Sequence, residues 1–147
     1  MLKKRIIFSL LFSEGYFNLS RNFRLQKIGD MNWLLNNYDF SNVSRSIDEL
    51  IVLDVTRGPR DSNLFLDAVR KLSEGVFIPI SLGGGIKDFD DAKIYFDSGA
   101  DKIIMNTSLF DSNKLIDKIS SVYGSQSIIA YLDIKQEEEN FFLYKNN

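Results

Sequence analysis

Three consecutive glycines, Gly83, Gly84 and Gly85, follow an apolar run and precede a segment that begins at Asp88 and is typical of a helix. Glycine has no side chain to keep a ligand away from the backbone N–H groups, and the amino-terminal end of a helix carries partial positive charge. The alternative is a tight turn that needs a positive φ, for which one glycine would be enough. We therefore predict that these glycines bind a phosphate group.

Polar side chains also follow the other apolar runs. Asp54 and Asp133 each end such a run, and Asn106 and Thr107 follow another. The chain has no His and no Cys, so acid–base chemistry would fall to carboxylates, Lys or Tyr. Asp54 and Asp133 are the candidate catalytic residues. Without His and Cys the usual transition-metal ligand sets are missing, and we predict neither a metal site nor a cofactor.

Apolar runs that alternate with single amphipathic helical segments predict parallel βαβ units with right-handed crossovers. Either a doubly wound sheet or part of an eight-stranded barrel fits this order, and in both the binding groups gather where strands end. We therefore expect the glycines, the two aspartates and the Asn-Thr pair to share one rim. Strands are expected at residues 6–12, 50–55, 76–82, 103–105 and 127–133. Helices are expected to begin after Asp30, Asp61 or Ser62, Asp88, and Asp111 or Ser112, the last two ending at Gly99 and Gly124.

Two segments do not fit the alternation. Residues 14–29 are polar and aromatic without a clean period, and we predict a long loop there. The tail has an acidic turn at residues 137–139 followed by an apolar segment at 141–144, which predicts a hairpin. The basic and then apolar opening of the chain is predicted as a buried strand, because it is too short for a membrane span and no cleavage site follows it.

Composition limits the kind of protein. With 147 residues, 44% of them hydrophobic and 26% charged, the chain is expected to form a single domain over residues 1–147. A net charge of -2 without a basic cluster argues against nucleic acid as a partner. We also expect no membrane partner and a cytoplasmic location.

An internal comparison favours the barrel. Residues 6–13 can be laid over residues 128–135, which match at both isoleucines and at the following leucine. On this alignment Leu11 stands where the repeat has Asp133. Short apolar strands resemble each other by chance, so the comparison alone is weak. If it is true, the chain is a half of four units plus the first strand of another half.

A longer series of motifs is specific to one family. The series resembles the cyclase subunit of imidazole glycerol phosphate synthase, a (βα)8 barrel of two similar halves. The resemblance implies about four and a half units of a TIM-type barrel, up to the fifth strand and the start of a hairpin. The motifs are Lys4-Arg5-Ile6-Ile7, Gly29-Asp30, Asp48-Glu49-Leu50, Leu53-Asp54-Val55-Thr56, Ile78-Pro79, Gly83-Gly84-Gly85-Ile86, Gly99-Ala100-Asp101-Lys102, Asn106-Thr107, Gly124-Ser125-Gln126 and Leu132-Asp133.

The resemblance implies an activity and roles for particular residues. In that family, ammonia from a glutaminase partner enters the bottom of the barrel and attacks a phosphorylated ribulosyl substrate at the top. Asp133 matches one of two catalytic aspartates, and Gly85, Asn106 and Thr107 match one of two phosphate sites.

Three further positions match a charged ring that guards the ammonia entrance. They are Arg5, Glu49 and Lys102. The alternative for these residues is ordinary salt bridging at the bottom of a barrel.

Two positions depart from the family. Its other catalytic aspartate falls on Leu11, and its substrate-binding lysine falls on Leu19, so two-carboxylate catalysis is not available here. Four and a half units cannot close a barrel, and the open edges make self-association of the half-barrel possible. Three functions follow: a divergent or impaired cyclase in histidine biosynthesis; a cyclase-like partner of a glutaminase that channels ammonia for sugar amidination in surface-polysaccharide synthesis; or a non-catalytic phosphate-binding half-barrel or gene fragment.

Overall fold

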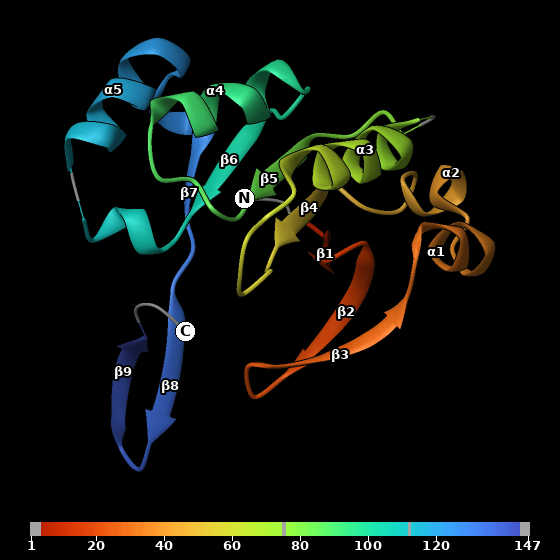
Figure 1. Cartoon of the computed structure of the whole chain (residues 1–147), viewed down its shortest axis with the longest axis horizontal. Coiled ribbons are helices and arrows are strands. Elements are labelled where there is room, and N and C mark those ends of the chain that lie inside the picture. The colour runs from red at the N-terminus through yellow and green to blue at the C-terminus, as the bar shows by residue number, and fades with distance from the viewer. Residues whose placement is uncertain (1–3, 75, 112, 145–147) are drawn as a thin grey trace.

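The computed structural model describes residues 4–74, 76–111 and 113–144, and its main feature is a seven-stranded sheet (Figure 1). The strands lie in the order β3-β2-β1-β4-β5-β6-β7. The five strands from β1 to β7 are parallel, and they follow one another across the sheet in chain order. A doubly wound sheet reverses its strand order at a switch point. The unbroken order is therefore that of a barrel wall, and the expected parallel α/β fold is confirmed.

The parallel strands and their helices alternate as expected. In Figure 1, α3, α4 and α5 lie side by side along the sheet. Asp30, Asp61 and Asp88 cap the helices after them by accepting backbone N–H bonds. Ser112, the alternative cap of α5, lies outside the described residues. The bounds are β1 Ile7–Ser13, α1 Met31–Asn37, α2 Phe40–Val43, β4 Glu49–Asp54, α3 Ser62–Ser73, β5 Ile80–Gly83, α4 Phe89–Asp97, β6 Lys102–Met105, η1 Thr107–Leu109, α5 Asn113–Tyr123, η2 Ser125–Ser127 and β7 Ile128–Ala130.

The prediction of a long loop at residues 14–29 was wrong. This segment forms the antiparallel hairpin of β2 (Tyr16–Arg21) and β3 (Arg24–Gly29), which extends the sheet beyond β1. Its two-residue turn places Asn22 and Phe23 at positive φ, as tight hairpin turns require. In β2 only Phe17 is fully covered, whereas Leu19 is exposed. A strand with a single buried residue gives no alternating pattern, which is why the sequence did not reveal it.

Two predicted strands are shorter than expected. The expected strand at 76–82 begins only at Ile80, where β5 (Ile80–Gly83) starts, because Phe77 points into solvent and Pro79 has no N–H for a ladder. Of the expected strand at 127–133 only β7 forms, since Ser127 lies in η2 and exposed Leu132 lies in no strand. Within the described part of the chain, β7 pairs on one side only, with β6.

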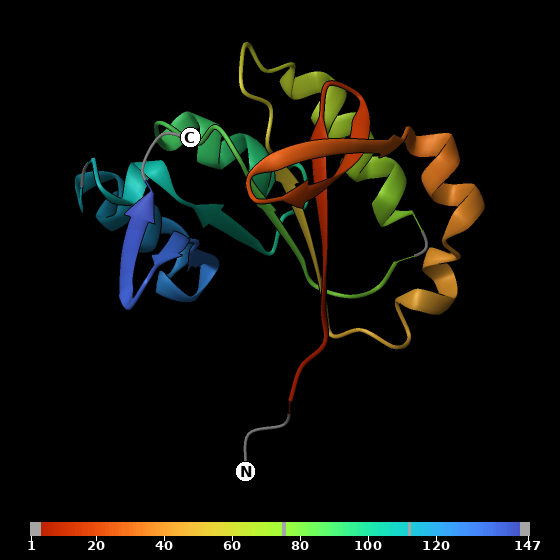
Figure 2. The same ribbon diagram turned by 90° about the horizontal axis from the view of Figure 1, so that it is seen from below.

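The tail forms the predicted hairpin. Strand β8 (Asp133–Glu137) pairs antiparallel with β9 (Asn140–Tyr144) around Glu138 and Glu139. Both views show this hairpin apart from the one formed by β2 and β3 (Figures 1 and 2). The apolar core lies instead under α3, α4 and α5, where Phe65, Leu82 and Ile103 are fully buried.

No helix in the described ranges is both long enough and apolar enough to cross a membrane.

Candidate functional site

A cavity of about 700 Å³ opens where β4, β5 and β6 end. Six of the predicted site residues line it together, as the common-rim prediction requires: Asp54, Gly84, Gly85, Asn106, Thr107 and Asp133. The tip of the β2–β3 hairpin closes one side with Phe23 and Leu25. The structure therefore brings these six residues together, although only Asp54 among them is the last residue of a strand.

Asp54 is the last residue of β4, and it is only 4% exposed. One carboxylate oxygen, Oδ1, accepts the backbone N–H of Thr56 at 3.0 Å. The other, Oδ2, lies 3.6 Å from Nε of Arg60. A buried carboxylate is costly unless it is paired and hydrogen-bonded. Both conditions hold here, so the Asp54 carboxylate is fixed in position at the cavity wall.

The glycine turn follows β5 and lies against Asp54. Gly84 has φ 111°, and a Cβ on it would meet the carbonyl oxygen of Asp54 at 2.1 Å. Gly85 has φ 70°, and a Cβ there would meet Cδ of Arg60 at 2.9 Å. Each glycine thus combines a left-handed backbone with a close neighbour. Gly83 differs, because it is the last residue of β5 and does not line the cavity.

Tyr95 of α4 holds the glycine turn in place through a hydrogen bond. Its hydroxyl donates to the carbonyl oxygen of Gly84 at 2.7 Å. Burial raises the pKa of Tyr95 far above its usual value, and the negative charge of Asp54 raises it further. The hydroxyl therefore keeps its proton throughout the working pH range and remains a donor to the turn.

Asn106 and Asp133 meet on the other side of the cavity. Nδ2 of Asn106 donates to Oδ2 of Asp133 at 2.8 Å. Asp133 is the first residue of β8 rather than the end of a strand, and this bond still brings it to the rim. Oδ1 of Asn106 is buried without a hydrogen-bond partner in the described chain. A buried acceptor of this kind can take an O–H or N–H from a ligand or water.

Part of the cavity wall is apolar. Leu11 lines it together with Leu53 and Ile104. Leu19, the second departure from the family, is 59% exposed and lies outside the cavity. Leu11, which the resemblance places opposite a catalytic aspartate, therefore presents an uncharged side chain to this cavity.

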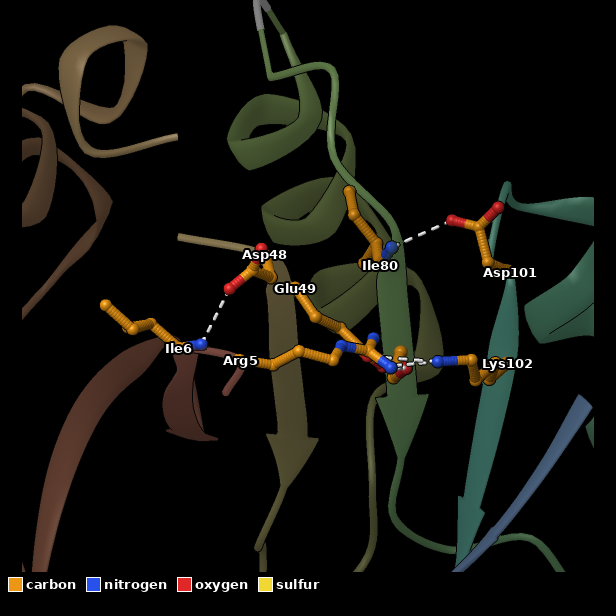
Figure 3. Close-up of polar contacts among 8 residues, drawn as sticks. Arg5, Ile6, Asp48, Glu49, Ile80, Asp101 and Lys102 are labelled. Atoms are coloured by element: carbon orange, nitrogen blue, oxygen red, sulfur yellow. Dashed lines mark hydrogen bonds and ion pairs between the residues drawn. The ribbon is translucent and has the colours of Figure 1, made fainter. Parts of the chain in front are cut away.

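A charged cluster lies at the opposite ends of the same strands (Figure 3). Glu49 begins β4 and Asp54 ends it, which separates them by about 16 Å along the strand. Glu49 is 2% exposed. It accepts from Arg5 at 2.7 Å and from Lys102 at 2.9 and 3.0 Å. The three residues predicted for the ring thus meet on one carboxylate.

Ser81 of β5 completes the cluster by donating to Oε1 of Glu49 at 2.5 Å. Burial alone would raise the pKa of Glu49. The Ser81 hydrogen bond and the neighbouring Lys102 and Arg5 outweigh burial and hold this pKa below its ordinary value of 4.5. Glu49 is therefore ionised at neutral pH despite its burial.

Two aspartates anchor the cluster to the sheet. Asp48 accepts the N–H of Ile6 at 2.7 Å, and Asp101 accepts the N–H of Ile80 at 2.8 Å (Figure 3). Each aspartate also donates its own N–H to the carbonyl of the same partner. Because each one directly precedes a cluster residue, these paired bonds fix the strand ends from which Glu49 and Lys102 project.

Sequence reasoning missed several residues of both sites. Arg60 lies within the loop between β4 and α3 rather than at the end of β4, so the strand-end rule that found Asp54 did not find it. Ser81 and Tyr95 are buried, and they lie within a strand and a helix whose sequences predict ordinary core packing. Neither position carries a signal in the sequence that separates it from ordinary packing.

Comparisons with known proteins show which family the chain is similar to. A family model described as "Histidine biosynthesis protein" matches residues 29–146. A Parasynechococcus marenigrum protein named "Putative imidazole glycerol phosphate synthase subunit hisF2" is 51% identical over 147 residues, which are 100% of this chain and 55% of that protein. Imidazole glycerol phosphate synthase subunit HisF of Methanococcus maripaludis is 38% identical over 137 residues, which are 92% of this chain and 49% of that protein.

The chain spans about half the length of these relatives. The similarity reaches far beyond the glycine turn, because it covers nearly every element from the first strand to the tail hairpin. The chain therefore belongs to the histidine biosynthesis protein family, and over its whole length it resembles the cyclase subunit of imidazole glycerol phosphate synthase.

Proposed function

We propose that the chain is a cyclase-type part of an imidazole glycerol phosphate synthase that uses ammonia from a glutaminase partner on a phosphorylated ribulosyl substrate. The observation that carries this proposal is the cavity where Asp54, the Gly84-Gly85 turn, Asn106 and Asp133 meet. Backbone N–H groups beside a helix start suit a phosphate ester, and the carboxylate of Asp133 suits proton transfer.

The proposal assigns each end of the strands a different task. The phosphate binds at Gly84, Gly85, Asn106 and Thr107, with Asp133 as the acid–base group. Ammonia enters at the cluster of Arg5, Glu49 and Lys102, which lies where the parallel strands begin. The chain forms one barrel-type domain in this proposal, and a cytoplasmic location stays a prediction from sequence.

Gly85→Asp tests the phosphate site. The new carboxylate would lie beside the bound anion, and we expect binding of glycerol 3-phosphate, measured by calorimetry, to fall below detection. Gly99→Asp is the matched control, because Gly99 has a similar positive φ of 97° but no atom within 4 Å of a Cβ. Both variants add one negative charge at a glycine with positive φ. Equal phosphate affinity in the two variants would refute the proposed site.

A second candidate function is a chain that delivers ammonia but does not cyclise its substrate. The observation that favours it is Leu11, which presents an apolar side chain to the cavity where the family has an acid. This candidate keeps the charged cluster and the glutaminase partner. It dispenses with the two-carboxylate chemistry.

Leu11→Asp separates the two candidates. For an impaired cyclase, restoring the second carboxylate is expected to raise the rate of imidazole glycerol phosphate formation by about 10²-fold. The rate is measured with the glutaminase or with excess ammonium salt. Unchanged turnover in a folded Leu11→Asp protein would support the ammonia-delivering alternative.

A further inference from the structure

The glycines of the proposed phosphate site carry no charge that could offset repulsion between a bound phosphate and a neighbouring carboxylate. Asp54 is a buried carboxylate that pairs with Arg60, and both its backbone carbonyl and its Cβ lie against the Gly84 turn. A phosphate bound at this turn would meet a like charge at close range, and like charges repel most strongly where water is excluded. The inference rests on the proposed phosphate site and concerns the cation that offsets this repulsion.

Three cationic side chains line the cavity, namely Arg57, Arg60 and Lys87. Arg57 donates to the backbone carbonyl of Phe23 in the hairpin tip, which directs its guanidinium toward the β2–β3 hairpin. Lys87 is exposed and is placed one residue before the helix cap. Arg60 is the cation that lies on the glycine turn itself.

The position of Arg60 depends on the missing side chain of Gly85. A Cβ on Gly85 would come within 2.9 Å of Cδ, 3.2 Å of Nε and 3.4 Å of NH1 of Arg60. The guanidinium thus covers the face of the turn where a side chain would otherwise stand. It also forms part of a second hollow, about 240 Å³ in volume, on the far side of the turn toward Tyr95.

Asp54 pairs with Arg60 but leaves its guanidinium able to bind a ligand. Oδ2 lies 3.6 Å from Nε, which is an ion-pair distance rather than a tight hydrogen bond. The Arg60 side chain is 33% exposed, so a ligand in the cavity can reach it. Arginine presents two parallel N–H donors to a phosphate, which a single ammonium cannot do.

We propose that Arg60 is a phosphate-binding residue. Asp54 orients its guanidinium, and the missing side chain of Gly85 leaves room for it against the turn. The guanidinium donates to the phosphate oxygens and balances the charge of Asp54. Asp54 is then a positioning residue for this cation as well as a candidate catalytic residue.

Arg60→Gln is the direct test, with glycerol 3-phosphate as the probe in calorimetric titrations of the whole chain. Loss of charge-assisted hydrogen bonds is expected to weaken binding at least about 10-fold. Arg60→Lys is expected to fall between this variant and the unsubstituted protein. Arg70→Gln is the matched control, since Arg70 is an exposed arginine of α3 paired with Asp67, and its affinity is expected to stay within about 2-fold.

A purely structural role for Arg60 makes a different prediction. If Arg60 only neutralises Asp54, its loss has no effect once Asp54 carries no charge. Asp54→Asn removes both a repulsive charge and the carboxylate that orients Arg60, so it serves here as the background in which Arg60 has no charge to neutralise. We expect Arg60→Gln to weaken binding about 10-fold even in the Asp54→Asn background.

The outcomes separate this inference from the proposed function. If Arg60→Gln has no effect in the Asp54→Asn background while Gly85→Asp still abolishes binding, the role of Arg60 is refuted and the phosphate site stands. If the unsubstituted chain does not bind the probe, both are refuted. Circular dichroism identifies any variant that has unfolded, and the double variant, which buries no unpaired charge, keeps the test valid if Arg60→Gln alone does not fold.

Discussion

Replacing Gly84 by alanine is expected to destabilise the protein by about 3 kcal/mol or more. Two costs add at this position. The backbone has φ 111°, which alanine adopts poorly, and the new Cβ would stand 2.1 Å from the carbonyl oxygen of Asp54. Because that neighbour is backbone, relief requires β4 and the turn to move apart. The free energy of unfolding from urea titrations measures the effect.

Gly99→Ala is the control for backbone strain alone. Gly99 has φ 97° and open space around a Cβ, so we expect a cost of about 1 kcal/mol there. The excess at Gly84 therefore reports how closely the turn approaches Asp54. If the two variants lose the same stability, the turn and the end of β4 are not in the contact described.

Glu49→Ala is the second substitution with a large expected effect, a loss of about 3 kcal/mol. It removes the acceptor shared by Lys102, Arg5 and the fully buried hydroxyl of Ser81. Partial exposure of Arg5 and Lys102 limits the cost, because water can solvate the released cations. Asp67→Ala breaks an exposed ion pair and is expected to change stability by less than about 0.5 kcal/mol.

The Glu49 cluster also predicts a pH dependence. The folded-state pKa of Glu49 lies below its ordinary value of 4.5, so the unfolded chain takes up a proton at a higher pH than the folded chain. The stabilisation is complete above pH 4.5 and is lost as the pH falls through the folded-state pKa. Glu49→Gln should lose less stability than the unsubstituted protein between pH 6 and about pH 3.5. Identical pH slopes in the two proteins would show that the cluster does not retain the charge.

The parallel framework was predictable because each of its elements has a strong local signal. Buried runs such as the one in β4 are apolar almost throughout, and Asp30, Asp61 and Asp88 cap their helices through local hydrogen bonds. The common rim followed from this framework, since parallel strands end on the same side. The site prediction therefore depended on topology more than on any single motif.

What the sequence did not reveal depends on contacts between distant residues. The β2–β3 hairpin buries Phe17 against β1 and exposes Leu19, so it lacks the alternation that marks a strand. Arg60 becomes part of the site only because Gly85 leaves room for it, and Tyr95 only because Gly84 turns its carbonyl toward α4. Gly83 has the same type as its neighbours, yet it belongs to β5 and packs against Leu53 and Ile104.

The central claim is that the rim of β4, β5 and β6 binds a phosphate ester as a single site. Titration of the isotopically labelled chain with glycerol 3-phosphate tests it, with backbone amide chemical shifts as the readout. We expect the amides of Gly84, Gly85 and Thr107 to shift together with one dissociation constant, while those of Glu49 and Lys102 at the opposite strand ends stay in place. Shifts centred on the Glu49 cluster, or no saturable shift at the glycine turn, would contradict the account.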